Sequence, residues 1–145
     1  LKVCKNGRHI APEFASGYYD AISFGIDFTA RDLQAKCKAD GTPWEIAKAF
    51  DQSAAVGSFI PVDSFADPLN ISFRTVLNGE DVQQGNTRDL IFSFDHIISF
   101  ASRFFKMQIG DLIFTGTPAG VGPVQIGDVL EGYIGDRKMI SCEIR

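Results

Sequence analysis

A chain of 145 residues with 45% hydrophobic and 22% charged residues is long enough for one domain with a sizeable core. Its net charge of −4 argues against a function that depends on contacts with nucleic-acid phosphates. The three cysteines form no CxxC pair, which favours idle thiols in a reducing compartment over a disulfide scaffold or a zinc site, and no apolar run reaches the roughly 18 residues of a membrane span.

The start of the chain has the pattern of a strand that is already under way. The first residue is Leu1 rather than Met, and residues 1–5 continue that pattern. We therefore expect the sequence to be the C-terminal piece of a longer protein. Asn6-Gly7 predicts a turn, and Pro12-Glu13 predicts a short helical turn with proline in its favoured first position. His9 is interpreted as a loop histidine that faces solvent.

Residues 21–28 predict a strand that passes directly into a helix over residues 31–38. Every second residue from Ile22 to Phe28 lies on one apolar face, and Asp27 falls on the other. A carboxylate in such a run needs a cation, hydrogen-bond donors or a metal, because an isolated buried charge is costly. Asp27 either caps the helix or pairs with Arg31, or it is a metal or substrate ligand at a strand end.

The helix is expected to end at Gly41, and Pro43 prevents its continuation. Residues 44–51 then place one lysine, Lys48, among apolar residues. Lys48 either snorkels to solvent or is a cation held in an apolar pocket. Residues 51–68 are interpreted as a long irregular connection, and such a loop in a compact domain is often functional.

The strongest local signal is a β-hairpin. Residues 70–77 alternate, Asn78-Gly79 provides a type I′ turn, and residues 80–84 return. Residues 85–89 then form a polar loop. A helix is predicted over residues 93–105, with Ser93 or Asp95 as its cap and with a 3.6-residue apolar stripe made up of Phe94, Ile97, Ile98, Ala101, Phe104 and Phe105. His96 lies beside this stripe and is interpreted as a surface residue.

A loop rich in glycine and proline, residues 116–123, follows what reads as a short buried strand over residues 112–115. The loop lacks the GxxxxGK[ST] and GxGxxG patterns that hold nucleotide phosphates. Its exposed backbone N–H groups and the hydroxyl of Thr117 suit a small anion such as a carboxylate, and a purely structural turn is equally compatible with its composition. A second hairpin over residues 128–144 ends the chain.

Taken together, the polar groups on this β-rich chain resemble the fumarylacetoacetate hydrolase superfamily, especially its bacterial acylpyruvate hydrolase and hydroxyhepta-diene-dioate isomerase-like members. The resemblance spans nearly the whole chain. It rests on four runs in order: Asp27 through Gln34, Lys48-Ala49-Phe50, Gly79 through Thr87 leading to Ile91-Phe92, and Gly110-Asp111 through Pro123.

The resemblance implies an α+β fold, in which mixed β-sheets roll into a β-sandwich-like core with short flanking helices. Residues 1–145 would form a single catalytic domain that lacks its N-terminal portion. The resemblance also implies a divalent metal, Mg²⁺ or Mn²⁺, bound by three carboxylates. Asp27 matches the third of them. The other two, a Glu-x-Glu pair, and the His–Glu base of the hydrolases are expected before Leu1.

The resemblance assigns further roles residue by residue. Lys48 matches a catalytic lysine that supplies positive charge to a developing oxyanion. Arg31 and Gln34 match positions that hydrogen-bond the substrate or its oxyanion. Thr117 and the backbone of Gly116 match the loop that holds the substrate carboxylate.

The expected function is metal-dependent hydrolysis of C–C bonds in acylpyruvate-like acids through a metal-stabilised enolate. An isomerase or an oxaloacetate decarboxylase on the same scaffold is the enzymatic alternative. An inactive dimerising or binding module is the alternative of another class. We expect a small oxo-acid substrate, a homodimer and a cytoplasmic location, with neither nucleic acid nor membrane as a partner.

Overall fold

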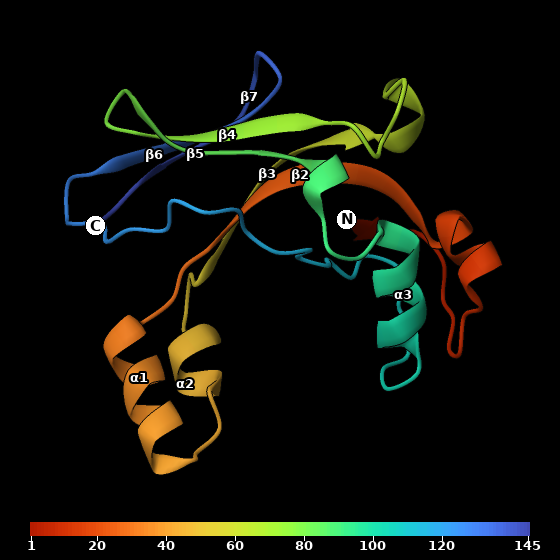
Figure 1. Cartoon of the computed structure of the whole chain (residues 1–145), viewed down its shortest axis with the longest axis horizontal. Coiled ribbons are helices and arrows are strands. Elements are labelled where there is room, and N and C mark those ends of the chain that lie inside the picture. Colours follow the sequence, from red (N-terminus) through yellow and green to blue (C-terminus); the bar gives the residue numbers. More distant parts are fainter. The chain divides into compact units, whose positions relative to one another are not determined.

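The computed structural model describes all residues from 1 to 145, and the chain divides into two compact units. The first, here called the sheet unit, comprises Leu1–Phe24 and Gly57–Arg145. The second, here called the helical unit, comprises Gly25–Val56. Figure 1 shows small β-sheets with a few short helices, which confirms the predicted α+β class.

A four-stranded antiparallel sheet with the order β5-β4-β6-β7 occupies much of the sheet unit. Its strands are β4 (Ser72–Leu77), β5 (Glu80–Asn86), β6 (Val129–Ile134) and β7 (Arg137–Glu143). Both predicted hairpins are therefore confirmed. In the first, Asn78 and Gly79 have φ values of 51° and 89°, and two positive φ values at the turn are what a type I′ hairpin requires.

A second sheet has the order β1-β2-β3, with β1 at Lys2–Val3, β2 at Tyr19–Asp27 and β3 at Ala54–Pro61. The predicted strand at the start of the chain and the strand leading to Asp27 are both confirmed. The irregular connection predicted for residues 51–68 is wrong, because β3 occupies much of it. Its Ala, Gly and Ser residues give a weak local strand signal, and pairing with β2 decides its conformation.

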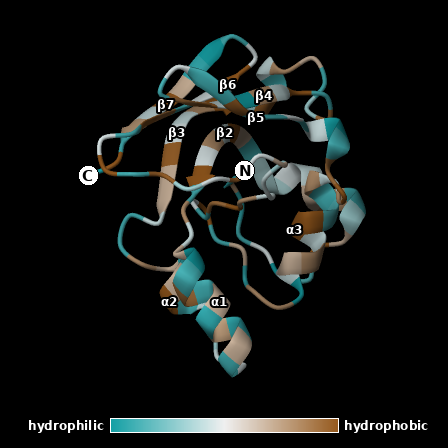
Figure 2. Cartoon of the chain, turned by 60° about the vertical axis from the view of Figure 1, so that its left-hand side comes forward, coloured by the Kyte–Doolittle hydropathy of each residue, from teal (hydrophilic) through white to brown (hydrophobic).

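A compact apolar cluster lies where the 3₁₀ helix η1 (Pro12–Tyr18) and helix α3 (Phe94–Ser102) pack together. The buried members of this cluster are Val3, Ile10, Ala15, Ile98 and Met107. The Ser93 hydroxyl caps α3 by accepting the N–H of His96, as predicted. Figure 2 shows apolar residues in brown on α3, whereas α1 (Arg31–Asp40) carries many hydrophilic residues in teal. Two further 3₁₀ helices, η2 (Val62–Ser64) and η3 (Thr87–Asp89), precede and follow the first hairpin.

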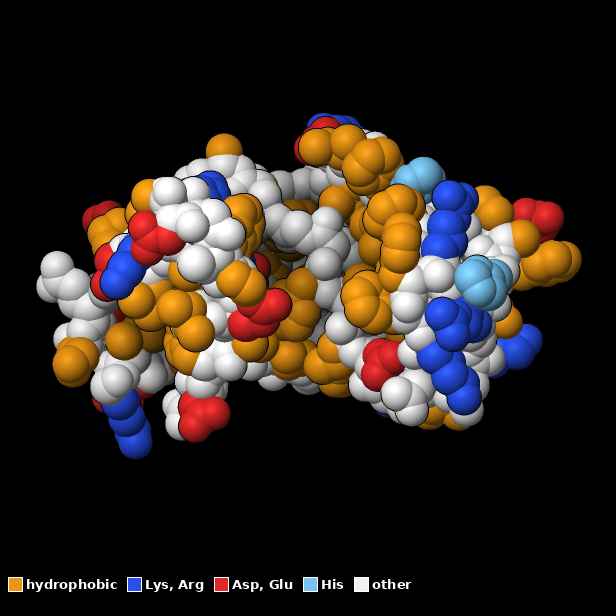
Figure 3. All heavy atoms as spheres, turned by 90° about the horizontal axis from the view of Figure 1, so that it is seen from below, with side chains coloured by type: hydrophobic (Ala, Val, Ile, Leu, Met, Phe, Trp, Pro, Cys, Tyr) orange, Lys and Arg blue, Asp and Glu red, His pale blue; other side chains and the backbone are white.

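Helix α3 ends at Ser102, three residues before the predicted end. The buried Ser102 hydroxyl donates to Ser99 O and accepts the N–H of Ile10, so it ties the helix end to the chain before η1. Phe104 and Phe105 consequently leave the apolar stripe and are exposed, contrary to the prediction. Figure 3 shows exposed hydrophobic side chains beside Lys, Arg and His at the end of the molecule that holds α3 and η1.

Aromatic side chains also form a stacked row on the outer face of α3. Phe92 stacks on His96, His96 on Phe100, and Phe100 contacts Phe104 at a tilt. His96 is exposed, which confirms its interpretation as a surface residue, and His9 is exposed as well.

The short buried strand predicted for residues 112–115 is not formed. Leu112 makes only an isolated bridge with Lys2, and Leu112 and Phe114 are each 42% exposed. Leu1 and Ile113 exchange backbone hydrogen bonds, and Val3 N donates to Asp111 O, so this segment pairs with the start of the chain without forming a regular strand. None of the helices has the length and continuous apolar character that crossing a bilayer requires.

Close packing between the sheets depends on a missing side chain at Gly132 of β6. A Cβ at this position would overlap the buried ring of Phe24, which packs edge-on against Phe73. We predict that Gly132→Ala lowers the free energy of unfolding by about 1–3 kcal/mol, as overpacking does in other cores. Urea unfolding measures this change. Gly17→Ala is the control, because a Cβ at Gly17 meets nothing within 4 Å; equal losses for the two variants would contradict the packing argument.

Candidate functional site

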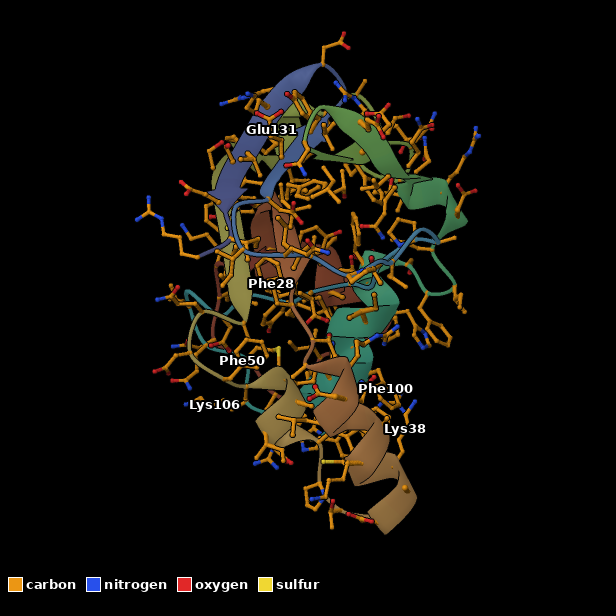
Figure 4. The ribbon with its side chains drawn as sticks, turned by 90° about the vertical axis from the view of Figure 1, so that its left-hand side faces the viewer. Phe28, Lys38, Phe50, Phe100, Lys106 and Glu131 are labelled. Atoms are coloured by element: carbon orange, nitrogen blue, oxygen red, sulfur yellow. The ribbon has the colours of Figure 1, made fainter.

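The helical unit positions Asp27 at the end of β2 and Lys48 at the end of a short helix, α2 (Glu45–Lys48). Helix α1 ends where Gly41 adopts a φ of 66° and its N–H bonds to Cys37 O, as predicted for a glycine that follows a helix. The chain then turns back into α2, and Ala30 N donates to Ala47 O at 3.1 Å. Phe28, labelled in Figure 4 beside β2, donates its N–H to Ser53 O.

The Lys48 ammonium connects these elements. Its Nζ donates to Asp27 Oδ2 at 2.7 Å and to Thr29 Oγ1 at 2.7 Å. The side chains of Lys48 and Asp27 are 35% and 47% exposed. An ion pair so open to water contributes at most about 1 kcal/mol to stability, so stability alone is a weak reason for this arrangement.

Both local interpretations of Asp27 as a structural residue are wrong. Helix α1 begins after Ala30 and has no side-chain cap, so Asp27 does not cap it. The carboxylate of Asp27 pairs with Lys48 rather than with Arg31. Lys48 neither snorkels freely to solvent nor lies in an apolar pocket. Its side chain is 35% exposed, and its ammonium is hydrogen-bonded to two oxygens.

Arg31 and Gln34 lie together on the first turn of α1. Arg31 Nη1 donates to Gln34 Oε1 at 3.1 Å, and Gln34 is buried apart from 9% of its surface. Arg31 is exposed, so its other N–H groups remain accessible to a ligand. The catalytic roles assigned to Lys48, Arg31 and Gln34 stay predictions.

The metal expected at Asp27 can be tested against the donor atoms that are present. Asp27 Oδ2 accepts the Lys48 bond, and Oδ1 remains without a hydrogen bond from the chain. No group of three or more His, Cys, Asp or Glu side chains gathers in a way that could hold a metal ion. Hard divalent cations bind carboxylate oxygens, so Asp27 fits the role of one ligand but not of a complete site.

The predicted anion loop lies in the sheet unit. Gly116 and Gly120 have φ values of 120° and 97°, a backbone region that favours glycine. Thr117 is exposed, and its hydroxyl accepts a hydrogen bond from Gln83 Nε2 at 3.1 Å. The substrate-binding roles of Thr117 and Gly116 stay predictions.

Sequence reasoning places Thr29 at the strand–helix junction but assigns no role to Thr29 or Gln83. Thr29 follows Asp27 by two residues at a strand end, and this spacing could have indicated a shared partner. Gln83 gave no such signal, because its contact with Thr117 joins residues 34 positions apart.

Comparison with known proteins gives a family match over almost the whole chain. The model of the fumarylacetoacetate (FAA) hydrolase C-terminal family matches residues 2–145. "Oxaloacetate tautomerase FAHD1, mitochondrial" of Bos taurus is 40% identical over 130 residues, which cover 90% of this chain and 59% of that protein. "Oxaloacetate tautomerase YcgM" of Escherichia coli is 48% identical over 106 residues, which cover 72% of this chain and 48% of that protein.

A solved structure agrees with this match. The fumarylpyruvate hydrolase from Pseudomonas aeruginosa, in complex with Mn²⁺ and pyruvate, is 38% identical and superposes with a TM-score of 0.92 over 99% of this chain and 61% of that chain. The chain thus spans about three fifths of the length of such relatives. The Mn²⁺ in that neighbour supports divalent metal use in the family.

The exposure of the Lys48–Asp27 pair leads to a stability prediction. We expect Lys48→Met to lower the free energy of unfolding by less than about 1 kcal/mol, because water already screens both charges. Urea unfolding at low and high salt measures the change, with Lys36→Met, at another exposed lysine of the same unit, as the control. A loss of about 3–5 kcal/mol would instead indicate a buried structural ion pair.

Proposed function

We propose, because this chain belongs to the fumarylacetoacetate hydrolase family, that its complete gene product converts a small 2-oxo acid through an enolate. The first candidate is the 1,3-proton shift that interconverts the keto and enol forms of oxaloacetate. The second is hydrolysis of the C–C bond of an acylpyruvate. Both reactions place negative charge on the oxygen of an enolised ketone.

The observation that carries the proposal is the hydrogen bonding of Lys48. An ammonium group has three N–H donors, and Asp27 and Thr29 use two of them. The third N–H is free, and the side chain is 35% exposed, so a bound substrate can reach it. Two fixed oxygens aim this donor before substrate arrives. A preorganised donor toward an oxyanion is commonly worth about 3 kcal/mol in the transition state.

Asp27 would serve as one ligand of a divalent metal through its free oxygen, Oδ1. When bound, such a cation polarises the carbonyl oxygen of the substrate as a Lewis acid. Arg31, which is hydrogen-bonded to Gln34, offers further N–H donors to a substrate carboxylate or carbonyl oxygen. Thr117 and the backbone N–H groups of residues 116–123, here called the glycine loop, would bind the substrate carboxylate.

One consideration favours the proton shift over hydrolysis. The relatives described above from Bos taurus and Escherichia coli are named as oxaloacetate tautomerases, at 40% and 48% identity. Hydrolysis remains the second candidate because the Pseudomonas aeruginosa neighbour is a fumarylpyruvate hydrolase.

We predict that Lys48→Met lowers kcat for oxaloacetate tautomerisation by about 10²–10³-fold in the complete gene product, because the oxyanion loses its aimed donor. The enol absorbance of oxaloacetate with Mn²⁺ or Mg²⁺ present measures the rate. Lys36→Met is the matched control and should keep the wild-type rate. An active Lys48→Met variant would remove Lys48 from the mechanism.

The metal role of Asp27 has its own test. We predict that Asp27→Ala abolishes turnover and reduces the thermal shift that excess Mn²⁺ produces in the complete gene product. Parallel assays with acetylpyruvate separate the two candidate reactions. Faster cleavage of acetylpyruvate than tautomerisation of oxaloacetate would make hydrolysis the main function. An unchanged Mn²⁺ shift in Asp27→Ala would contradict the ligand role.

We also propose that the gene product forms a homodimer. Large apolar side chains remain exposed on the sheet unit, among them Phe92, Phe100 and Phe104, and a second copy would cover some of this surface. Light scattering coupled to size exclusion should give twice the chain mass, and a monomer mass would contradict the proposal. The cytoplasmic location stays a prediction, since the Bos taurus relative is named as mitochondrial.

A further inference from the structure

The glycine loop contacts strand β5 at two consecutive residues, Val82 and Gln83. Gln83 Nε2 donates to Thr117 Oγ1 at 3.1 Å and to Pro118 O at 3.2 Å. Next to it, a Cβ at Gly120 would overlap the carbonyl oxygen of Val82, so the loop backbone approaches β5 as closely as a glycine permits. The position of Thr117 is therefore set by β5 as well as by the loop itself.

A β-bulge on β5 accounts for this close contact with the loop. Thr75 of β4 pairs with Gln83, and the next residue, Val76, pairs with Asp81. Val82 is the extra residue between these two pairs. A bulge turns the side chains and carbonyls of its strand locally, and such features are frequent beside functional sites. Here the carbonyl of the extra residue faces Gly120 and the next side chain reaches Thr117.

The neighbours of Gln83 decide which way its amide points. The Pro118 carbonyl oxygen can only accept a hydrogen bond, so the atom next to it must be the NH₂ group. On the other side, the hydroxyl of Thr75 donates to Gln83 Oε1 at 3.3 Å, and Thr75 is buried. Both contacts agree on one orientation of the amide.

This orientation determines the role of the Thr117 hydroxyl. Because Thr117 Oγ1 accepts from the Gln83 amide, its own proton is not used in that bond. No other acceptor in the chain takes that proton, and the side chain is exposed. The hydroxyl proton is thus available to an incoming hydrogen-bond acceptor, such as a carboxylate.

We propose that Gln83 is a positioning residue that holds the Thr117 hydroxyl as a hydrogen-bond donor for the carboxylate of the 2-oxo acid. This inference rests on the proposed function, in which Thr117 binds that carboxylate. Gln83 does not touch the substrate. It acts through Thr117, and the bulge at Val82 and the small Gly120 bring the two side chains together.

Three variants in the complete gene product test this role. Gln83→Met removes the amide at similar volume and should weaken binding of pyruvate, measured by calorimetry, by about tenfold, with a matching rise in KM and little change in kcat. Gln83→Glu should weaken pyruvate binding more, because its carboxylate would accept the hydrogen bond of the Thr117 hydroxyl and repel the substrate carboxylate. Gln84→Met is the control, since Gln84 bonds only to Asp81, and should bind pyruvate like the wild type.

A double-mutant cycle separates positioning from a general structural effect. Thr117→Val should weaken pyruvate binding about as much as Gln83→Met, and the double variant should be no worse than Thr117→Val alone. If Thr117→Val weakens binding and Gln83→Met does not, the inference is overturned while the proposed function stands. Additive losses also overturn it. Absence of pyruvate binding and of turnover in the wild type overturns the proposed function and, with it, this inference.

Discussion

The ammonium of Lys48 is the point at which the helical unit closes on itself. From the end of α2, its Nζ donates one hydrogen bond to Asp27 at the end of β2 and one to Thr29, two residues before α1, each at 2.7 Å. Water reaches both charged partners, so the net stabilisation is small. The gain lies in geometry, because two fixed oxygens determine where the third N–H points. The same contacts leave one oxygen of Asp27 free for a cation.

The loop that carries Thr117 follows a similar principle in the sheet unit. A single amide, Gln83, receives a bond from buried Thr75 and gives two bonds to the loop. In both units, hydrogen bonds within the chain occupy part of the capacity of a polar group and leave one donor of that group free. Oxygen acceptors around Lys48 leave an N–H donor, and an N–H donor beside Thr117 leaves an O–H donor. Both remaining groups are hydrogen-bond donors, and each suits a negatively charged acceptor.

Much of the local structure could be predicted from the sequence. The Asn78-Gly79 turn, the cap at Ser93 and the end of α1 at Gly41 each depend on a backbone conformation that a few adjacent residues determine. The strand β3 and the irregular segment around Leu112 were missed for the opposite reason. Their conformation depends on which strand is available for pairing, and that strand is distant in the sequence.

The sequence by itself determined the residue types of the candidate site, its place at a strand–helix junction and the family that its motifs resemble. Only the tertiary structure decided that Asp27 pairs with Lys48, 21 residues away, rather than with its neighbour Arg31. Only the tertiary structure revealed the bulge that brings Gln83 to Thr117. The physical reason is that a turn or a cap is fixed by its own few dihedral angles. A hydrogen bond between distant residues requires the whole intervening backbone to place two atoms within 3 Å or so of each other.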